Sequence, residues 1–303
     1  MFTIVAGPTI AAAVKGVDVE GTATPVAVAA GLEGTGFDEA VELLSGARIA
    51  VLTGAGVSTD SGIPDYRGEG APRRTPMTLQ TFLGSEQARK RYWAGSHLGW
   101  RSFGQVQPNG GHLALARLEA AGLATGVVTQ NVDGLHRRAG SGRVVELHGS
   151  MDRVVCLQCG QLFARQAIAE RLERLNPAID LEQAVRQNPD GDVDVEDVDD
   201  MHLPECTVCG GMLKPDVVFF GEFVPVETFT TASGIVAAAD ALLVAGSSLV
   251  VNSGIRLIEV ARRRRMPIVV VNRGVTKGDA RAAVKIDAGT TETLTALAEA
   301  LGA

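Results

Sequence analysis

Short unbroken apolar runs alternate with stretches of helical periodicity through most of the chain. The apolar runs occupy residues 48–53, 126–129, 143–147, 241–245 and 268–271. Stretches with helical spacing lie between or around them, at residues 37–46, 112–121, 253–265 and 292–301. Apolar runs without polar alternation, joined through helices, are typical of a parallel sheet that is covered on both faces. We therefore expect a doubly wound, Rossmann-like α/β fold.

Two matched cysteine pairs give the most specific local signal. Cys156 and Cys159 form one C-x-x-C-G knuckle, and Cys206 and Cys209 form another. Each spacing lets two thiolates converge on one metal ion, and four thiolates complete a closed structural zinc site. The 46 residues between the pairs exceed the usual spacing, which indicates an insertion. A redox dithiol is the less favoured alternative, as is replacement of one cysteine ligand by His202.

These patterns divide the chain into four parts. Residues 1–36 show no sustained period and are expected to form a poorly ordered tail. Residues 37–150 and 212–303 are predicted to form the Rossmann-like domain. Within this range, residues 66–108 are predicted to be a helical insertion that belongs to the smaller lobe of the molecule. Residues 151–211 hold all four cysteines and are predicted to form a small zinc-binding domain.

Polar residues gather where the predicted strands end. The first strand leads into Gly54-Ala55-Gly56, a turn that lets backbone amides approach a pyrophosphate. Thr59 replaces the third glycine of the dinucleotide fingerprint, so the turn alone fits a plain strand–helix connection equally well. The other polar strand ends are Gln130-Asn131-Val132-Asp133, His148, Gly246-Ser247-Ser248 and Asn272. Such residues are costly at a buried edge unless they bind something, so the sequence predicts a ligand crevice here.

Composition and charge exclude several classes of protein. Only thirteen of the 303 residues are aromatic and 36 are glycine, so the core must consist of Ala, Val, Leu and Ile. The net charge of −7 argues against a general nucleic-acid-binding surface. The run Arg262–Arg265 is read as cations at a helix C-terminus, with a nucleic-acid or partner patch as the alternative.

Two further features are read without a special function. The acidic stretch 190–200 lacks the glycine and the final glutamate of a calcium loop, so we expect a solvated loop. No apolar run approaches the ~18 residues of a membrane span, and the N-terminus lacks the charge pattern of a targeting peptide. We expect a cytoplasmic protein that contacts no membrane.

Together the motifs resemble the sirtuin family of NAD-dependent protein deacylases. The stretches that carry the resemblance are Gly54–Ser58, Gly62–Arg67, Gln130–Asp133, His148-Gly149, the two cysteine knuckles, Gly246–Ser248 and Asn272. The resemblance covers the chain from about Phe37 to its end. Tyr92-Trp93, Gly99-Trp100 and Lys214–Glu222 are further similar to the class II, mitochondrial-like branch, which is associated with weak deacetylation, removal of longer acyl groups such as lipoyl, and ADP-ribosyl transfer. The residues after Gly68 lack the pair that reads acidic acyl groups in the class III branch.

The resemblance implies NAD as cofactor, one structural zinc ion and acyl-lysine proteins or peptides as substrates. The oligomeric state is left open, with a monomer favoured. His148 would be the general base, with Asn131 and Asp133 as further catalytic residues. The implied NAD contacts are Gly54, Ala55, Gly56, Ser58, Ile63, Asp65, Arg67, Gln130, Asn131, Asp133, Gly246, Ser247, Ser248, Asn272, Arg273, Gly274 and Ala288. The implied substrate contacts are Val218, Phe219, Gly221, Glu222 and Val250. For Phe219 and Phe220, core packing and a place in an acyl tunnel are equally favoured.

Two alternatives to deacylation are considered. Mono-ADP-ribosyl transfer to a protein would use the same crevice with a different nucleophile. A zinc-ribbon module that only binds a partner or nucleic acid is disfavoured by the net charge and by the acid-rich segment 151–211.

Overall fold

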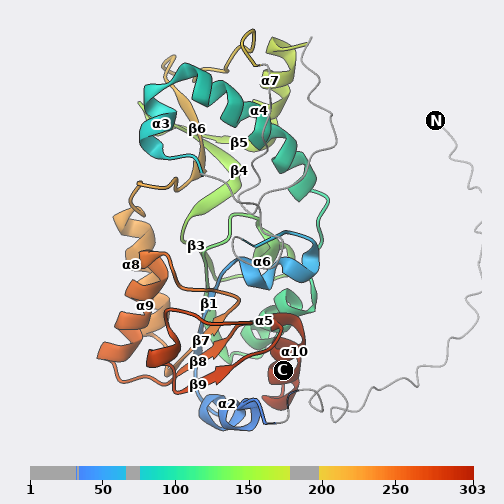
Figure 1. The fold of residues 1–303 in the computed structure, drawn as a ribbon, viewed down its shortest axis with the longest axis vertical. Coiled ribbons are helices and arrows are strands. Elements are labelled where there is room, and N and C mark those ends of the chain that lie inside the picture. Colours follow the sequence, from blue (N-terminus) through green and yellow to red (C-terminus); the bar gives the residue numbers. More distant parts are fainter. Residues whose placement is uncertain (1–31, 33, 66–75, 178–197) are drawn as a thin grey trace, which may run out of the picture.

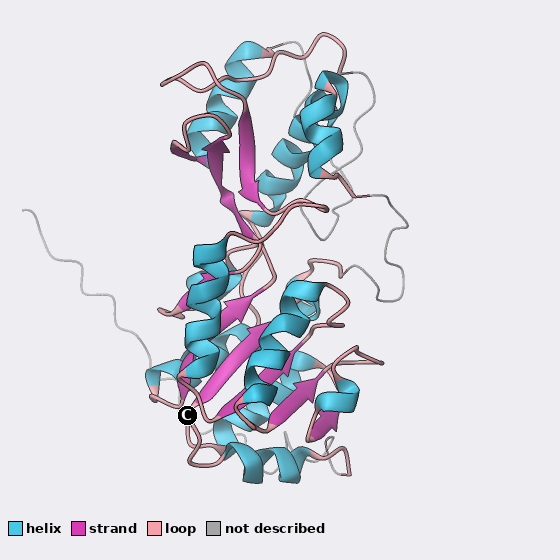
Figure 2. Cartoon of the chain, turned by 90° about the vertical axis from the view of Figure 1, so that its left-hand side faces the viewer, coloured by secondary structure: helices cyan, strands magenta, loops and turns pink. Residues whose placement is uncertain are grey.

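The computed structural model describes residues 32, 34–65, 76–177 and 198–303. These residues form two sheets, one at each end of an elongated molecule (Figures 1 and 2). The predicted tail lies almost wholly outside the described residues. So do Arg67 and most of the acidic stretch 190–200.

The larger sheet has six parallel strands and confirms the predicted fold class. Its order is β3 (Val144–Glu146), β2 (Ala124–Thr129), β1 (Ile49–Thr53), β7 (Ala241–Ala245), β8 (Ile268–Val271) and β9 (Val284–Ile286). The direction of chain progression reverses between β1 and β7. Parallel sheets bind their ligands beyond the carboxyl ends of the strands at such a switch point.

Helices cover both faces of this sheet. On one face lie α2 (Phe37–Leu44), α5 (Gly110–Ala120) and α10 (Thr290–Ala300), and on the other lie α8 (Val226–Ala237) and α9 (Asn252–Arg263). Successive side chains of a strand point to opposite faces, so Val51 joins the first layer and Leu52 the second. Both side chains are fully buried, which is why β1 reads as an unbroken apolar run.

The smaller sheet is antiparallel, in the order β5 (Leu162–Ala164), β4 (Gly149–Cys156) and β6 (Leu213–Val217). The helices α3 (Leu79–Gly84), α4 (Glu86–Phe103) and α7 (Arg165–Leu175) share its hydrophobic core, to which Phe82, Trp93 and Ile168 contribute. The helices α3 and α4 lie within the predicted helical segment 66–108. Pairing of β4 with β6 joins residues on both sides of the cysteine-containing segment.

The remaining elements are short. The 3₁₀ turns η1 (Ala55–Val57) and η2 (Thr59–Ser61) follow β1, α6 (Leu135–Arg138) follows β2, and η3 (Asp279–Arg281) precedes β9. Among the residues that the structure describes, no helix is both long and apolar enough to cross a bilayer.

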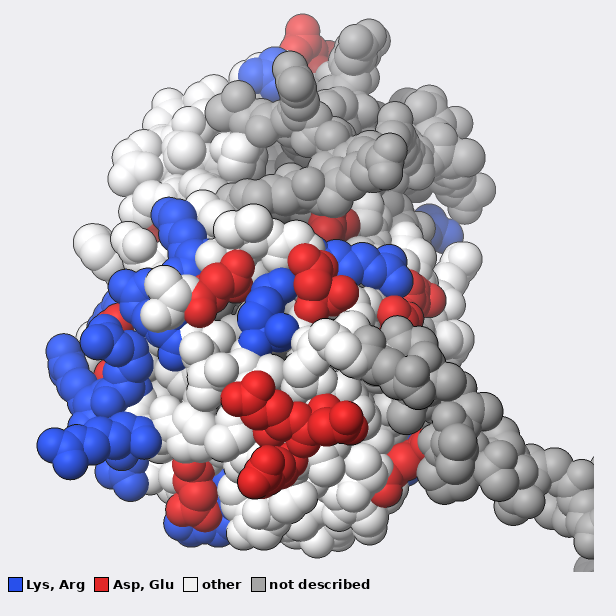
Figure 3. All heavy atoms as spheres, turned by 60° about the horizontal axis from the view of Figure 1, so that its bottom comes forward, with Lys and Arg blue, Asp and Glu red and all other residues white. Residues whose placement is uncertain are grey.

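The arginine run lies at the end of α9, as the sequence predicted. Arg262 and Arg263 occupy the last turn of this helix, and Arg262 donates to Glu259 at 2.9 Å. The end of the molecule near α2 presents one group of basic and one group of acidic side chains, with both kinds side by side above them (Figure 3). Because Arg262 and Arg263 lie in the last turn of α9, they offset the negative end of its dipole.

We predict that Leu52→Ala lowers the free energy of unfolding by roughly 2–5 kcal/mol, because it leaves a cavity in a fully buried strand. Urea denaturation followed by circular dichroism measures the change. Leu113→Ala is the matched control, because the Leu113 side chain is 50% exposed, and it should change stability by less than about 0.5 kcal/mol. Equal losses in the two variants would contradict the assignment of Leu52 to the core.

Candidate active site

The loops after β1 and β7 meet at the switch point of the parallel sheet. The amide of Gly54 donates to Ala245 O at 3.2 Å, and the amide of Gly56 donates to Gly246 O at 2.8 Å. A Cβ atom on Gly56 would lie 2.8 Å from the Cα atom of Gly246, and Gly246 itself has φ +61°. Only glycine allows the two backbones to come this close.

A buried polar network lies directly beside the glycine loop. The Ser58 hydroxyl donates to Asp133 Oδ2 at 2.7 Å, and the Asn131 side-chain amide donates to Ser58 Oγ and to Gly54 O, both at 3.1 Å. Burial raises the pKa of Asp133, while hydrogen bonds from the Leu135 amide and from Ser58 oppose that rise. The structure thus brings together three predicted site residues from two strand ends.

The N-terminus of α5 adds His112 to this network. Asn109 caps the helix, and its backbone amide donates to His112 Nδ1 at 3.3 Å. The Asn109 side-chain oxygen already accepts from the amides of Gly111 and His112. The Nδ1 atom also lies 3.0 Å from the Asn109 side-chain oxygen, and the Nε2 atom faces Ser58 Oγ at 3.5 Å. Burial lowers the pKa of His112 to about 4, so the ring is neutral at pH 7.

His136 is a second buried histidine of this region. Its ring centroid lies 4.8 Å from that of His112, and its Nε2 atom lies 2.8 Å from the Thr53 hydroxyl at the end of β1. Sequence reasoning assigned no role to His112 or His136. The usable signal was Asn109 at an N-cap position with a polar residue at the third helical position.

His148 is held with one ring nitrogen in a defined state. The Nδ1 atom lies 2.9 Å from the carbonyl oxygen of Gln130, which can only accept, so Nδ1 carries the proton. The Nε2 atom therefore accepts from the Ser253 hydroxyl at 2.8 Å. Burial lowers the pKa of His148, and the carbonyl of Gln130 partly opposes this effect. The arrangement leaves Nε2 as a basic atom at neutral pH, and Ser253 is a contact that sequence reasoning missed.

The other predicted cofactor contacts line the same edge of the sheet. The Ser247 hydroxyl donates to Gln130 Oε1 at 2.6 Å, which connects the ends of β7 and β2. Asn272 donates to Arg273 O at 2.7 Å, and the Gly274 amide donates to Asp287 Oδ1 at 2.9 Å. Ala55 is half-buried at the start of η1, and three further predicted contacts are half-buried in loops: Asp65, Ser248 and Ala288. Arg67 lies outside the described residues.

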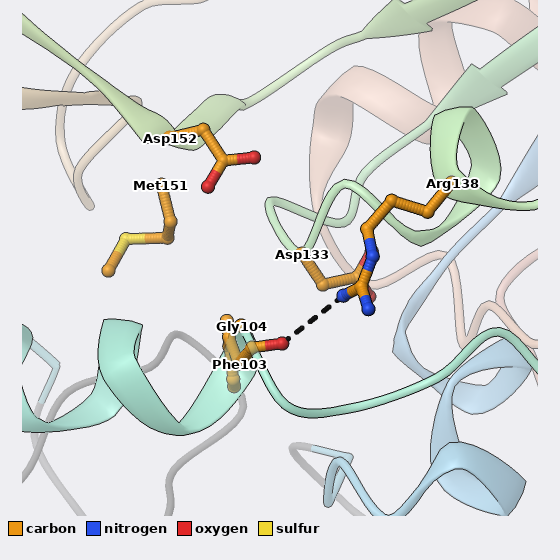
Figure 4. Close-up of a pocket in the computed structure, with 6 residues that line it drawn as sticks. All are labelled: Phe103, Gly104, Asp133, Arg138, Met151 and Asp152. Atoms are coloured by element: carbon orange, nitrogen blue, oxygen red, sulfur yellow. Dashed lines mark hydrogen bonds between the residues drawn. The ribbon is translucent and has the colours of Figure 1, made fainter. Parts of the chain in front are cut away.

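Ile63 and a cavity mark the side of the site nearest the small sheet. Ile63 is buried against Phe103, Leu135 and Met151. The cavity, of about 220 Å³, is lined by Phe103, Gly104, Asp133, Arg138, Met151 and Asp152 (Figure 4). It shares Asp133 with the polar network, so a ligand at the strand ends has open space on this side.

The predicted substrate segment adjoins His148. The Val218 amide donates to His148 O at 2.8 Å. Phe219 is buried, with ring centroids 5.2 Å from Phe82 and 4.9 Å from Tyr92, whereas Phe220 is 46% exposed. The structure thus places Phe219 in the hydrophobic core, which was one of the two predicted alternatives. Val250 lies half-buried in the loop before α9.

The four cysteines converge as predicted. Their sulfur atoms all lie within 4.8 Å of one another, with Cys156 Sγ 3.6 Å from Cys209 Sγ and Cys159 Sγ 3.7 Å from Cys206 Sγ. In the described part of the chain, this ligand cluster contains cysteines alone and not His202. Four soft sulfur donors without an open position fit a structural zinc ion.

Comparison with known proteins gives consistent matches. The model of the Sir2 family matches residues 54–253. NAD-dependent protein deacetylase 1 of Mycobacterium avium (strain 104) is 52% identical over 267 residues, covering 87% of this chain and 95% of the relative. NAD-dependent protein deacetylase 1 of Streptomyces coelicolor is 52% identical over 258 residues, covering 84% and 86%. A solved structure of Sir2 with a p53 peptide and NAD+ is 31% identical, with a TM-score of 0.68 and coverage of 87% and 97%.

We predict one zinc ion per chain, and its loss in Cys206→Ser. Removing one thiolate should release the metal and lower the melting temperature, because zinc connects the two knuckles of the small lobe. Metal analysis and thermal unfolding of the purified variant measure both effects. Thr207→Ser, in the same knuckle, should retain zinc. A full zinc complement in Cys206→Ser would contradict the four-cysteine site.

We predict that stability falls as the pH is lowered from 7 to 5, in part through His112. The pKa of His112 is about 4 in the folded protein and about 6.5 when unfolded, so between these values the unfolded chain binds more protons. At pH 5 this difference in the pKa of His112 lowers the free energy of unfolding by roughly 2 kcal/mol. Urea unfolding at the two pH values should show a smaller difference for His112→Gln than for the unchanged protein. As a control, His202→Gln changes an exposed histidine and should leave the loss of stability between pH 7 and pH 5 as it is in the unchanged protein. If His112→Gln showed that same loss, the role of His112 would be refuted.

Proposed function

Because the chain belongs to the Sir2 family, we propose that it is an NAD-dependent protein deacetylase that acts on acyl-lysine side chains. The single observation that carries this proposal is the position of His148. The half-buried ring holds its proton on Nδ1 against Gln130 O at the end of β2, so Nε2 is left as the acceptor, and Gln130 in turn accepts from Ser247 at the end of β7. The relatives named for this activity extend over most of the chain.

The strand-end residues fit the parts of NAD. The turn from Gly54 to Ser58 offers backbone amides and a hydroxyl for the phosphates, which helix-start and glycine-rich turns bind well. Ser247, Ser248 and Asn272 offer hydroxyl and amide groups for the adenosine half. When bound, NAD supplies an activated ribose carbon, with nicotinamide as the leaving group.

Asp133 and Asn131 are the groups proposed to stabilise the reacting sugar. Positive charge that develops on a ribose is stabilised by a fixed carboxylate in a water-poor site. The hydrogen bonds of Asp133 with Ser58 and Leu135 favour its ionised form against the effect of burial. Asn131, held by Gly54 O and Ser58 Oγ, keeps this carboxylate next to the glycine loop.

His148 is proposed to act as the general base. Its Nδ1 proton is fixed by Gln130 O, so the ring accepts a proton only at Nε2. A ribose hydroxyl that replaced the Ser253 hydroxyl at Nε2 would lose its proton to the ring, and its oxygen would become the nucleophile. With NAD bound, the complete exchange would break the nicotinamide–ribose bond and the C–N bond between the acyl group and lysine, place the acyl group on a ribose oxygen and consume one water.

The substrate is proposed to be an acyl-lysine peptide that lies extended between residues 218–222 and 249–252. Support comes from the connection of Val218 to His148 and from the peptide held by the solved Sir2 relative. Tyr92-Trp93 and Gly99-Trp100 support a place in the class II branch, which is associated with weak deacetylation, removal of longer acyl groups such as lipoyl, and ADP-ribosyl transfer. Recognition of a peptide through its main-chain hydrogen bonds tolerates many peptide sequences. We further propose that the protein acts as a monomer.

We predict that His148→Tyr abolishes NAD-dependent deacylation. Loss of a general base costs roughly 10²–10⁴-fold in rate. Mass spectrometry of peptides bearing acetyl-, butyryl- or lipoyl-lysine, with and without NAD, measures acyl loss and the matching O-acyl-ADP-ribose. His202→Tyr, at an exposed histidine, is the control and should retain full activity.

Two results would overturn this assignment. Turnover retained by His148→Tyr would remove the proposed base. Label from adenine-labelled NAD that appears on protein, without free O-acyl-ADP-ribose, would assign the crevice to ADP-ribosyl transfer instead.

A further inference from the structure

Lys214 is a buried cation at the base of the proposed substrate segment. It lies on β6, and its side chain is 4% exposed. The ammonium donates to Val217 O at 2.5 Å and to Glu222 Oε2 at 3.0 Å, and it lies 4.5 Å from the ring centroid of Phe219. All three partners belong to the segment 217–222, which is therefore folded around this one charge.

Glu222 completes the arrangement. The oxygen that accepts from Lys214 also accepts from the Phe219 amide at 2.9 Å, and the Glu222 amide donates back to Phe219 O at 3.0 Å. Burial lowers the pKa of Lys214, and the charge of Glu222 opposes this effect. An ion pair removed from water needs good geometry and further hydrogen bonds to be tolerated, and both are present here.

The same segment is fixed to its surroundings on two sides. On one side the Val218 amide donates to His148 O, and on the other the Leu79 amide of α3 donates to Phe220 O at 3.0 Å. Within the segment, Gly221 has φ +80°. The segment 217–222 is thus held near its start by His148 and in its middle by Leu79, and the Lys214 ammonium connects Val217 with Glu222 at its two ends.

We infer that Lys214 is a positioning residue, which through Glu222 holds residues 217–222 in the conformation that receives the substrate backbone beside His148. This inference rests on the proposed function. It also adds to the role predicted for Glu222, because one carboxylate oxygen, Oε2, is occupied by the ammonium of Lys214 and by the amide of Phe219. Through this oxygen Glu222 acts on the substrate by way of the loop.

The test compares the Michaelis constants of peptide and NAD in four variants. Lys214→Met retains an unbranched apolar chain of similar length against Phe219 but removes the charge. We expect it to raise the KM for an acetyl-lysine peptide about tenfold or more, because a loop displaced by a fraction of an ångström loses its substrate contacts. The KM for NAD should change less than about twofold, because its proposed contacts lie on the parallel sheet.

Three further variants separate positioning from stability. Lys214→Arg retains the cation and should recover part of the peptide affinity. Glu222→Gln retains an acceptor for the Phe219 amide and should raise the peptide KM less than Lys214→Met does. The double variant K214M/E222Q leaves no unpaired buried charge, so its melting temperature should recover while its peptide KM remains high.

The outcomes distinguish this inference from the proposed function. An unchanged protein without NAD-dependent turnover on any acyl peptide would refute the proposed function. An active protein whose Lys214→Met variant has the same peptide KM would overturn the positioning role alone. The role would also be overturned if the double variant regained both stability and peptide affinity, because the loop would then not require the ion pair.

Discussion

The close approach of the glycine turns after β1 and β7 is the constraint on which the site depends. Two backbones in contact leave no room for side chains at Gly56 and Gly246, and the amide of Gly56 is satisfied by the facing carbonyl. This contact fixes the end of β1 against the end of β7 at the switch point of the sheet. It thereby places Ser58 over the end of β2, where Asn131 and Asp133 meet it.

Three histidines, two of them buried and one half-buried, lie around this contact. His112, His136 and His148 each face one hydroxyl group, those of Ser58, Thr53 and Ser253 respectively. Burial lowers the pKa of all three, so each ring is neutral and has one donor and one acceptor nitrogen. At His148 the carbonyl oxygen of Gln130 occupies Nδ1, so the acceptor role of Nε2 follows. There the backbone determines which nitrogen can accept a proton.

The sequence was most informative where burial is complete. Strands such as β7, flanked by helices on both faces, read as unbroken apolar runs and were predicted at their observed bounds. β9 was missed because it has three residues and half-buried Lys285 at its centre, and α8 because Thr and Gly interrupt its pattern. The polar residues of the crevice were predicted from the strand ends that carry them. Ser253 and His112 were not, since each reaches the site from a helix start distant in sequence.

The eight-residue strand β4 begins directly after His148 and ends at Cys156. At about 3.3 Å per residue it spans at most roughly 26 Å, with the proposed base before one end, a cysteine of the metal cluster at the other and an irregular register with β6 between Gly149 and Val154. Its partner β6 runs back from the second knuckle to the loop held by Lys214. The metal cluster, the strand that leads from the proposed base and the strand that leads to the peptide-facing loop therefore all belong to one small antiparallel sheet.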